Sequence, residues 1–188
     1  VDWRKVVVDW KPLSDAERTR MAAERRGERE RAEADRRLAA ELAAMGAAEL
    51  LASAKREGIS PYLQRKLVEG ESCRYLPDGT IVIPLMRYDL PVDQRLQAVQ
   101  RILPSGQKFY SKGFDKPGCC VRLGQIDADA TPLLLVVEGF ATGLTARMAT
   151  DKAHPVFVAL DAGNLAHVVP LLRKLYPQLA QQRHHMRQ

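Results

Sequence analysis

Residues 133–160 read LLLVVEGFATGLTARMATDKAHPVFVAL, which is two short apolar runs with a stretch of helical spacing between them. The runs at 133–137 and 156–160 contain no polar residue, as is typical of strands that are buried on both faces. Residues 140–150 and 165–175 have the apolar spacing of helices that pack on such strands. Strands that alternate with helices indicate a parallel α/β unit, so this stretch decides the architecture of the second half of the chain.

Polar residues follow each of these two predicted strands, at the edge of a parallel sheet where ligands bind. Glu138 and Gly139 follow the first strand, and Asp161, Gly163 and Asn164 follow the second. A carboxylate there can hold Mg²⁺ or move a proton, and a glycine allows close approach of a phosphate. Helix capping explains the same residues, because acidic groups favour the first turn of a helix. Spacing alone leaves both roles open.

The preceding segment, residues 58–131, predicts a mixed β layer with one short helix. The Ser-Pro pair at 60–61 can start a helix over 61–68, and Pro-Asp-Gly at 77–79 and Pro-Ser-Gly at 104–106 are turn signals. Strands are expected at 74–76, 80–86, 96–103, 107–110 and 120–123.

Basic and aromatic residues are interleaved across two of these strands and the loop after them. They are Arg101, Lys108, Phe109, Tyr110, Lys112, Phe114 and Lys116. Such a mixture suits a single nucleic-acid strand, whose phosphates meet the cations while its bases stack on the rings. A hairpin with a solvated outer face and two core aromatics has the same composition. The sequence leaves both interpretations open.

Residues 14–57 predict one long charged helix that begins with the capping-box pair Ser14 and Glu17. The segment holds ten basic and ten acidic residues and is therefore neutral. Leu38, Leu42 and Met45 fall on one face, so we expect the second half to dock and the first half to be solvated. The segment is either a solvated arm or linker, or a helix that binds a partner.

The composition excludes several classes of protein. Hydrophobic residues make up 46% of the chain and charged residues 28%, which is usual for a folded protein. With apolar runs far below the ~20 residues of a membrane span and no signal peptide at its start, the chain is expected to be cytoplasmic, without a membrane partner. Cys73, Cys119 and Cys120 have neither disulfide nor zinc spacing. The net charge of +6 comes mainly from residues 58–188, with sixteen basic and eleven acidic residues.

Five stretches in order resemble the TOPRIM-type DNA primases of plasmids, phages and integrated mobile elements, which are similar to the bacterial replicative primase. They are PYLQRKLV (61–68), DGTIVIPLM (78–86), LQAVQRILPSGQKFYSKG (96–113), LLLVVEGFATGLTA (133–146) and VFVALDAGNLAHVVPLLRKLYP (156–177). The resemblance covers residues 58–177. It implies an enzyme of DNA replication, a nucleotidyltransferase that makes short RNA primers from NTPs on single-stranded DNA.

The fold class that follows is α/β, or α+β overall, in three parts. An N-terminal segment with the long helix (1–57) precedes a mixed β primase-core subdomain (58–131) and an incomplete TOPRIM-like β-α-β-α unit (132–188).

The resemblance also assigns roles at the predicted sheet edge. It makes Glu138 the catalytic acid/base or metal-site carboxylate, with Gly139 as its partner glycine, and Asp161 a metal-site carboxylate. Gly163 and Asn164 would form the turn that faces the same cleft and the nucleotide. In such enzymes phosphoryl transfer relies on carboxylates that hold Mg²⁺ or Mn²⁺.

In the primase core, the resemblance makes Lys108 the basic residue that faces template or nucleotide. Arg101 would lie on the neighbouring strand, and Lys112 follows in the same basic stretch. The expected partners are single-stranded DNA, NTPs, and a helicase or another replication protein.

One departure from the TOPRIM pattern bears on activity. That pattern continues with a third strand ending in Asp-x-Asp, which supplies most of the metal ligands, but no aspartate follows Asp161 here. Asp127 and Asp129 precede Glu138 and cannot replace the pair. We therefore expect a fragment or truncated relative of a primase that makes no primers alone. The alternatives are a non-catalytic TOPRIM-like module that binds single-stranded DNA, and a tether to a replication partner through residues 14–57.

Overall fold

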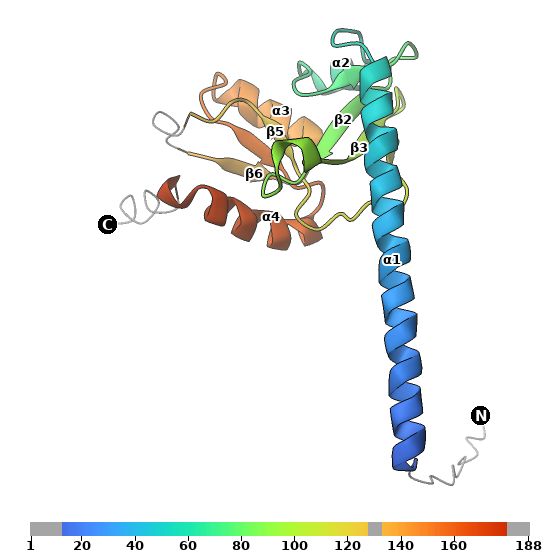
Figure 1. The fold of residues 1–188 in the computed structure, drawn as a ribbon. Helices are drawn as coiled ribbons and strands as arrows, with labels where there is room; N and C mark the ends of the chain where they lie inside the picture. Colours follow the sequence, from blue (N-terminus) through green and yellow to red (C-terminus); the bar gives the residue numbers. More distant parts are fainter. Residues whose placement is uncertain (1–12, 128–132, 180–188) are drawn as a thin grey trace, which may run out of the picture. The chain divides into compact units, whose positions relative to one another are not determined.

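A computed structural model describes residues 13–127 and 133–179 of the chain (Figure 1). The chain divides into two compact units, one that ends at Leu38 and one that begins at Ala39. All strands and all helices after the first belong to the second unit. The boundary expected between residues 131 and 132 lies outside the described residues.

The long predicted helix is present as α1 (Asp15–Ser53), which has 39 residues. Its start is the expected capping box, because Ser14 Oγ and Ser14 N both donate to Glu17 Oε2, at 2.7 and 2.8 Å. The helix ends before Gly58, since Lys55 leaves it to exchange two backbone hydrogen bonds with Tyr75. In the described part of the chain no helix, α1 included, is long and apolar enough to cross a bilayer.

The docking face of α1 differs from the prediction. Leu38, Leu42 and Met45 are 57%, 58% and 62% exposed, whereas Ala43 and Ala47 are buried. The prediction favoured the largest apolar side chains, but small alanines one turn apart let a helix backbone approach a sheet closely. The cluster on this face contains Ala47, Leu50, Leu51, Ala54, Leu76, Val82, Leu96 and Val99.

Four antiparallel strands form the first sheet, in the order β1-β2-β3-β4. They are β1 (Arg74–Tyr75), β2 (Ile81–Met86), β3 (Leu96–Ile102) and β4 (Lys108–Tyr110), preceded by helix α2 (Pro61–Lys66), and a 3₁₀ turn (Val92–Gln94) lies between β2 and β3. Every predicted strand from 74 to 110 is therefore present, within one or two residues of its expected ends. The turn at 77–79 reverses the chain between β1 and β2, and the turn at 104–106 reverses it between β3 and β4. Their Pro and Gly residues favour such turns.

The second sheet contains the two apolar runs at 133–137 and 156–160, which predict the α/β unit. Strands β5 (Val121–Leu123), β6 (Leu135–Val137) and β7 (Val156–Val158) have the order β5-β7-β6, with β6 and β7 parallel. Helices α3 (Phe140–Ala149) and α4 (Ala162–Leu175) follow β6 and β7. The predicted β-α-β-α order is confirmed. The sheet is nevertheless mixed, because β5 pairs antiparallel with β7.

The two helices cover opposite faces of this sheet (Figure 1). Val156 and Val158 on β7 share a core with Leu144 of α3, whereas Phe157 between them packs with Leu172 of α4. This alternation follows from the two-residue period of a strand. Because α3 follows β6 and α4 follows β7, the first turns of both helices lie at the carboxyl ends of these strands.

One backbone bridge joins the two sheets. Met86 at the end of β2 and Cys120 before β5 exchange two N–H···O bonds of 2.9 Å. Side chains of both sheets then share one core, which includes Ile81, Ile83, Leu85, Ile102, Val121, Leu123, Val156 and Val158. The shared core fixes the position of the second sheet against the first.

All three cysteines are free thiols, as their spacing predicts. Cys119 and Cys120 are buried, and burial raises the pKa of each thiol to about 12. Burial also raises the pKa of Cys73 to about 11. These thiols are poor nucleophiles at neutral pH, because the thiolate is the reactive form.

Candidate nucleic-acid interface

The two predicted site carboxylates lie at the same edge of the second sheet. Glu138 directly follows β6 and Asp161 follows β7, and these strands are parallel neighbours with Val137 opposite Val158. The Ala159 N–H continues the pairing with a 2.7 Å bond to the Val137 carbonyl. Glu138 is exposed, and within the described residues its side chain has no hydrogen bond or ion pair.

Asp161 has two defined partners. Its Oδ1 accepts a 2.9 Å hydrogen bond from the Asn164 N–H, which makes it the N-cap of α4. Its Oδ2 lies 2.6 Å from Lys116 Nζ in the loop between β4 and β5. The Lys116 bond, and after it the Asn164 N–H, hold the pKa of Asp161 below its usual value, and the same pair raises the pKa of Lys116. The capping role anticipated for Asp161 is confirmed.

Asn164 ties the loop that carries Lys116 to the second sheet. Its side chain is buried, and Nδ2 donates to the carbonyls of Cys119 and Ala159, both at 2.8 Å. Its Oδ1 accepts a 2.9 Å bond from the Gly118 N–H. These bonds occupy both amide hydrogens, so in this conformation Asn164 holds the loop rather than presenting its amide to solvent. Its predicted contact with nucleotide remains a prediction.

The two predicted glycines lie beside the carboxylates. Gly139 is the N-cap residue of α3 and is half-buried next to Glu138. Gly163 is exposed in the first turn of α4, where an added Cβ would stand 3.4 Å from Asp161 Oδ1. Both therefore keep side-chain atoms away from the sheet edge that holds Glu138 and Asp161.

The described residues do not by themselves complete a divalent-cation site. Within 13–127 and 133–179, no group of three or more His, Cys, Asp and Glu side chains converges. Glu138 has a free carboxylate, but both oxygens of Asp161 already accept hydrogen bonds. Mg²⁺ takes octahedral oxygen ligands and needs carboxylates that are open to it.

Strand β4 places cations and aromatic rings together at the edge of the first sheet. Lys108, Phe109 and Tyr110 are all exposed, and Lys112 is exposed in the turn that follows. In the described residues β4 pairs only with β3, so its other side has free backbone groups. The predicted strand 107–110 thus forms an edge that can contact a ligand with its side chains and its backbone.

The pleat divides the predicted basic residues between the two faces of this sheet. Arg101 on β3 is opposite Phe109 and lies over its ring, with Cζ 5.8 Å from the ring centroid. Lys108 and Tyr110 are displaced by one residue and therefore point to the other face. Arg101 lies on the neighbouring strand, as expected. It does not share a face with Lys108, because successive side chains in a strand alternate.

Tyr110 connects the β4 edge to the carboxyl edge of the second sheet. Its ring stacks on Phe114, with centroids 5.8 Å apart and an interplanar angle of 27°. Burial raises the pKa of Tyr110, the nearby Asp161 carboxylate raises it further, and the Lys116 ammonium opposes them. Tyr110, Phe114, Lys116 and Asp161 thus lead from β4 to the second sheet. We call these four residues the β4 interface, together with Lys108 on the face of Tyr110, Phe109 on the other face and Lys112 in the following turn.

The pairing of Lys116 with Asp161 is the part of the β4 interface that the sequence does not show. The two residues are 45 positions apart, and no local spacing relates them. Lys116 stands out in the sequence only as the last member of the basic and aromatic stretch. The parallel β6-β7 pair together with the Asn164 tie brings it to the carboxylate.

Removing the Lys116 ammonium tests this pairing. In Lys116→Met we expect the pKa of Asp161 to rise toward its ordinary value, because the hydrogen bond from Lys116 contributes most to lowering it. The folded pKa of Asp161 lies below its unfolded value, so its contribution to stability is present above pH ~4 and lost as the pH falls through the folded pKa. For a pair that is 43% exposed on both sides, that contribution stays under about 1 kcal/mol. Carboxyl-detected NMR titration measures the shift, and an unchanged pKa would contradict the pairing.

Sequence comparison relates the chain to part of a DNA primase. Two proteins of Escherichia coli, both called DNA primase TraC, are similar to it. One is 29% identical over 119 residues, or 63% of this chain, and the other is 35% identical over 86 residues, or 45% of this chain. Each matched segment spans only 8% of the length of its relative. No protein-family profile matches the chain, and no solved structure matches it.

Proposed function

We propose that this chain is the nucleic-acid-binding part of a DNA primase and that the β4 interface contacts single-stranded DNA. The observation that carries the proposal is an edge strand whose three residues, Lys108, Phe109 and Tyr110, are all exposed. The similarity to proteins called DNA primase TraC supports the choice of enzyme. The finer assignment, a TOPRIM-type primase of plasmids and other mobile elements, is part of the same proposal.

The chemistry of a single DNA strand matches the β4 interface. Its phosphates are attracted by lysines, and its unpaired bases can stack on aromatic rings, which gives about 1–3 kcal/mol per base. Lys108 and Lys112 are exposed and have no ion pair in the described residues, so their charge is available. Arg101 and Phe109 share the other face of the sheet, where the guanidinium lies over the ring and would hold it in place for a base.

We assign the carboxyl edge to the reaction of the complete primase. Glu138 would be the catalytic acid/base and the open carboxylate of the Mg²⁺ or Mn²⁺ site, which Asp161 would join by giving up its bond to Lys116. Gly139, Gly163 and Asn164 would form the cleft wall next to the incoming NTP. The exposed Glu138 carboxylate, free of partners in the described residues, fits a proton-transfer role at its Oε atoms. Lys116 would hold Asp161 ionised and in position.

The charge of the β4 interface can be removed without disturbing the core. In Lys108→Gln/Lys112→Gln we expect affinity for an oligothymidylate to fall about tenfold and the salt slope to decrease by roughly 1.4, from 0.7 for each lost phosphate contact. Fluorescence anisotropy over a salt titration measures both. The matched control is Lys66→Gln/Lys174→Gln, which removes two exposed lysines from α2 and α4. Equal losses in both double variants would mean non-specific attraction and would contradict the assignment.

Nucleotide dependence separates the primase proposal from its two alternatives. Primer synthesis from NTPs by the complete primase that is lost in Glu138→Ala would support a catalytic role. DNA binding without any dependence on NTPs or on Glu138 would instead favour a non-catalytic binding module. Salt-insensitive or absent DNA binding together with a stable protein complex through α1 would favour a tether to a helicase or another replication protein.

A further inference from the structure

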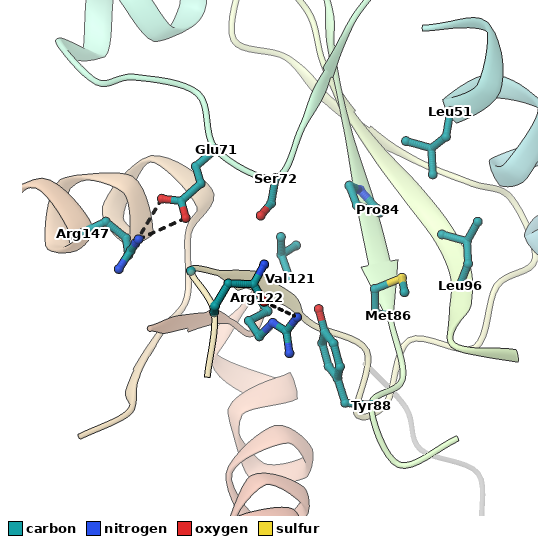
Figure 2. Close-up of a pocket in the computed structure, with 12 residues that line it drawn as sticks. Leu51, Glu71, Ser72, Pro84, Met86, Tyr88, Leu96, Val121, Arg122 and Arg147 are labelled. Carbon is teal, nitrogen blue, oxygen red and sulfur yellow. Dashed lines mark hydrogen bonds and ion pairs between the residues drawn. The ribbon is translucent and has the colours of Figure 1, made fainter. Parts of the chain in front are cut away.

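A hollow of about 570 Å³ is lined by residues of both sheets, and none of its lining residues belongs to β4 (Figure 2). We call it the Tyr88 hollow. Apolar side chains from both sheets and α1 form part of its wall, and polar groups from the second sheet, α3 and the segment before β1 form the rest. Its lining is Leu51, Glu71, Ser72, Pro84, Met86, Tyr88, Leu96, Val121, Arg122, Gly124, Gln125 and Arg147. Its size is in the range of pockets for small molecules.

Two arginines lie against the ring of Tyr88. Cζ of Arg122 is 5.3 Å and Cζ of Arg95 is 5.8 Å from the ring centroid, and the Phe157 ring packs at 89° to the Tyr88 ring with the centroids 5.5 Å apart. Of the two arginines, Arg122 lines the hollow. Figure 2 shows the Arg122 guanidinium beside the Tyr88 ring. A stacked guanidinium has lost part of its freedom and keeps its N–H groups for a planar acceptor, which favours phosphate.

The positive charge of these two arginines is not compensated within the described residues. There, neither has a carboxylate partner, since Arg95 Nε donates to the Leu90 carbonyl and Arg122 Nη2 has only Gln125 Oε1 at 3.5 Å. Arg147 on the opposite wall differs, because Glu71 and two backbone carbonyls take its donors. The hollow therefore contains one neutral ion pair and an unpaired arginine.

A second hollow of about 520 Å³ adjoins the first and is also basic. The two share Leu51, Ser72 and Pro84 in their walls, and the second adds Arg56 and Arg74. No carboxylate lines the second hollow among the described residues. Leu51 and Pro84 thus belong to the walls of both hollows, with Arg122 in the first and Arg56 and Arg74 in the second. An anion with an extended apolar body fits this arrangement better than a small inorganic ion does.

We propose that the Tyr88 hollow binds a nucleotide, with its phosphate on Arg122 and its base against the apolar side chains of Leu51 and Pro84. The phosphate can belong to a free nucleoside triphosphate or to a unit of a single strand, since both present the same phosphoester and base. The site is separate from the β4 interface, because Met86 and Leu96 lie at the end of β2 and β3 distant from the 100–102 pairing with β4. The proposal does not depend on DNA binding at β4.

Calorimetric titration of the full chain tests the site with four probes: ATP, GTP, inorganic pyrophosphate and a hexathymidylate. Arg122→Gln removes the cation, and Gln125→Glu places a carboxylate where it pairs with Arg122 while changing almost no volume. Each should weaken binding at least tenfold. Because Gln125 is exposed, Gln125→Glu should not disturb folding, and it tests the binding site even if Arg122→Gln fails to fold. The matched control is Arg31→Gln, on the exposed surface of α1.

The outcomes separate cleanly. Binding of ATP and GTP that falls in both variants but not in the control supports a free nucleotide. The same pattern with the hexathymidylate, measured in the Lys108→Gln/Lys112→Gln background, supports a unit of a strand. Pyrophosphate binding as tight as that of ATP would overturn the nucleotide assignment. So would the lack of any binding, or binding that neither variant changes. Lys108→Gln/Lys112→Gln should leave the site intact, so failure here and failure at the β4 interface are distinguishable.

Discussion

Replacing Arg147 with methionine is expected to lower the free energy of unfolding by about 3–5 kcal/mol, as for other broken buried ion pairs. Arg147 is only 7% exposed, and its guanidinium donates to both oxygens of Glu71 and to the carbonyls of Lys152 and His154. The variant would leave the Glu71 carboxylate partly buried without a partner and two carbonyls without donors. Urea denaturation followed by circular dichroism measures the change.

A nearby exposed ion pair provides the control for Arg147. Lys152 Nζ lies 3.3 Å from Glu69 Oε2, with side chains that are 56% and 78% exposed. Lys152→Met should therefore cost under about 1 kcal/mol. The Arg147→Met/Glu71→Met double variant should recover part of the loss, because it removes the orphaned charge as well. A loss below 1 kcal/mol in Arg147→Met would show that the pair does not hold the segment before β1 to α3.

The second large effect is expected at Asn164. Asn164→Leu keeps a similar volume but leaves the Gly118 N–H and the Cys119 and Ala159 carbonyls without their partner. A buried polar group left unsatisfied costs about 1–3 kcal/mol, so we expect a loss of about 3 kcal/mol. Since the same bonds position the loop that carries Lys116, the pKa of Asp161 should also rise.

Two measurements check the Asn164 prediction. Urea denaturation gives the stability, and NMR titration gives the pKa of Asp161. His167→Leu is the control, because His167 is exposed on the same helix and should change neither quantity appreciably. A destabilised Asn164→Leu protein with an unchanged Asp161 pKa would mean that the tie supports the core alone. An unchanged stability would contradict the role of Asn164 altogether.

The sequence predicts those parts of the fold that depend on near neighbours. The apolar runs at 133–137 and 156–160 give β6 and β7, and the Ser14–Glu17 pair marks the start of α1. These signals are local, because strand and helix periods and caps involve residues within a few positions of each other. The ends of elements shift by a few residues where tertiary contacts decide them, as with Lys55 after α1.

Contacts between distant segments were not predictable in the same way. The docking face of α1 depends on the sheet that it covers, so alanines can be buried while Leu42 and Met45 stay exposed. Likewise, β5 joins the second sheet although it precedes β6 by a long connection. Neither contact has a spacing that a single sequence displays. Residue size and charge indicate which side chains can interact, but not which segments meet.

The candidate site was predictable to a similar extent. The sequence indicates the candidate residues within each single element, namely the carboxylates after β6 and β7 and the basic and aromatic residues of β4. It does not indicate the partners that come from other elements, because Lys116 reaches Asp161 across 45 positions. The two faces of β3 and β4 also separate Arg101 from Lys108, which follows from strand alternation once the register is known. The Tyr88 hollow has no local signature, since six segments of the chain form its wall.

Photocrosslinking of a bromodeoxyuridine-substituted single strand to the full chain, followed by peptide mass spectrometry, tests the proposed DNA contact most directly. Halogenated bases crosslink to aromatic side chains within contact distance, so the crosslinked residue identifies the surface. We predict crosslinks within residues 108–112, at Phe109 or Tyr110, that disappear as salt displaces the strand. Crosslinks confined to α1, or none within 108–112 under conditions where the strand is bound, would contradict the assignment of the β4 interface.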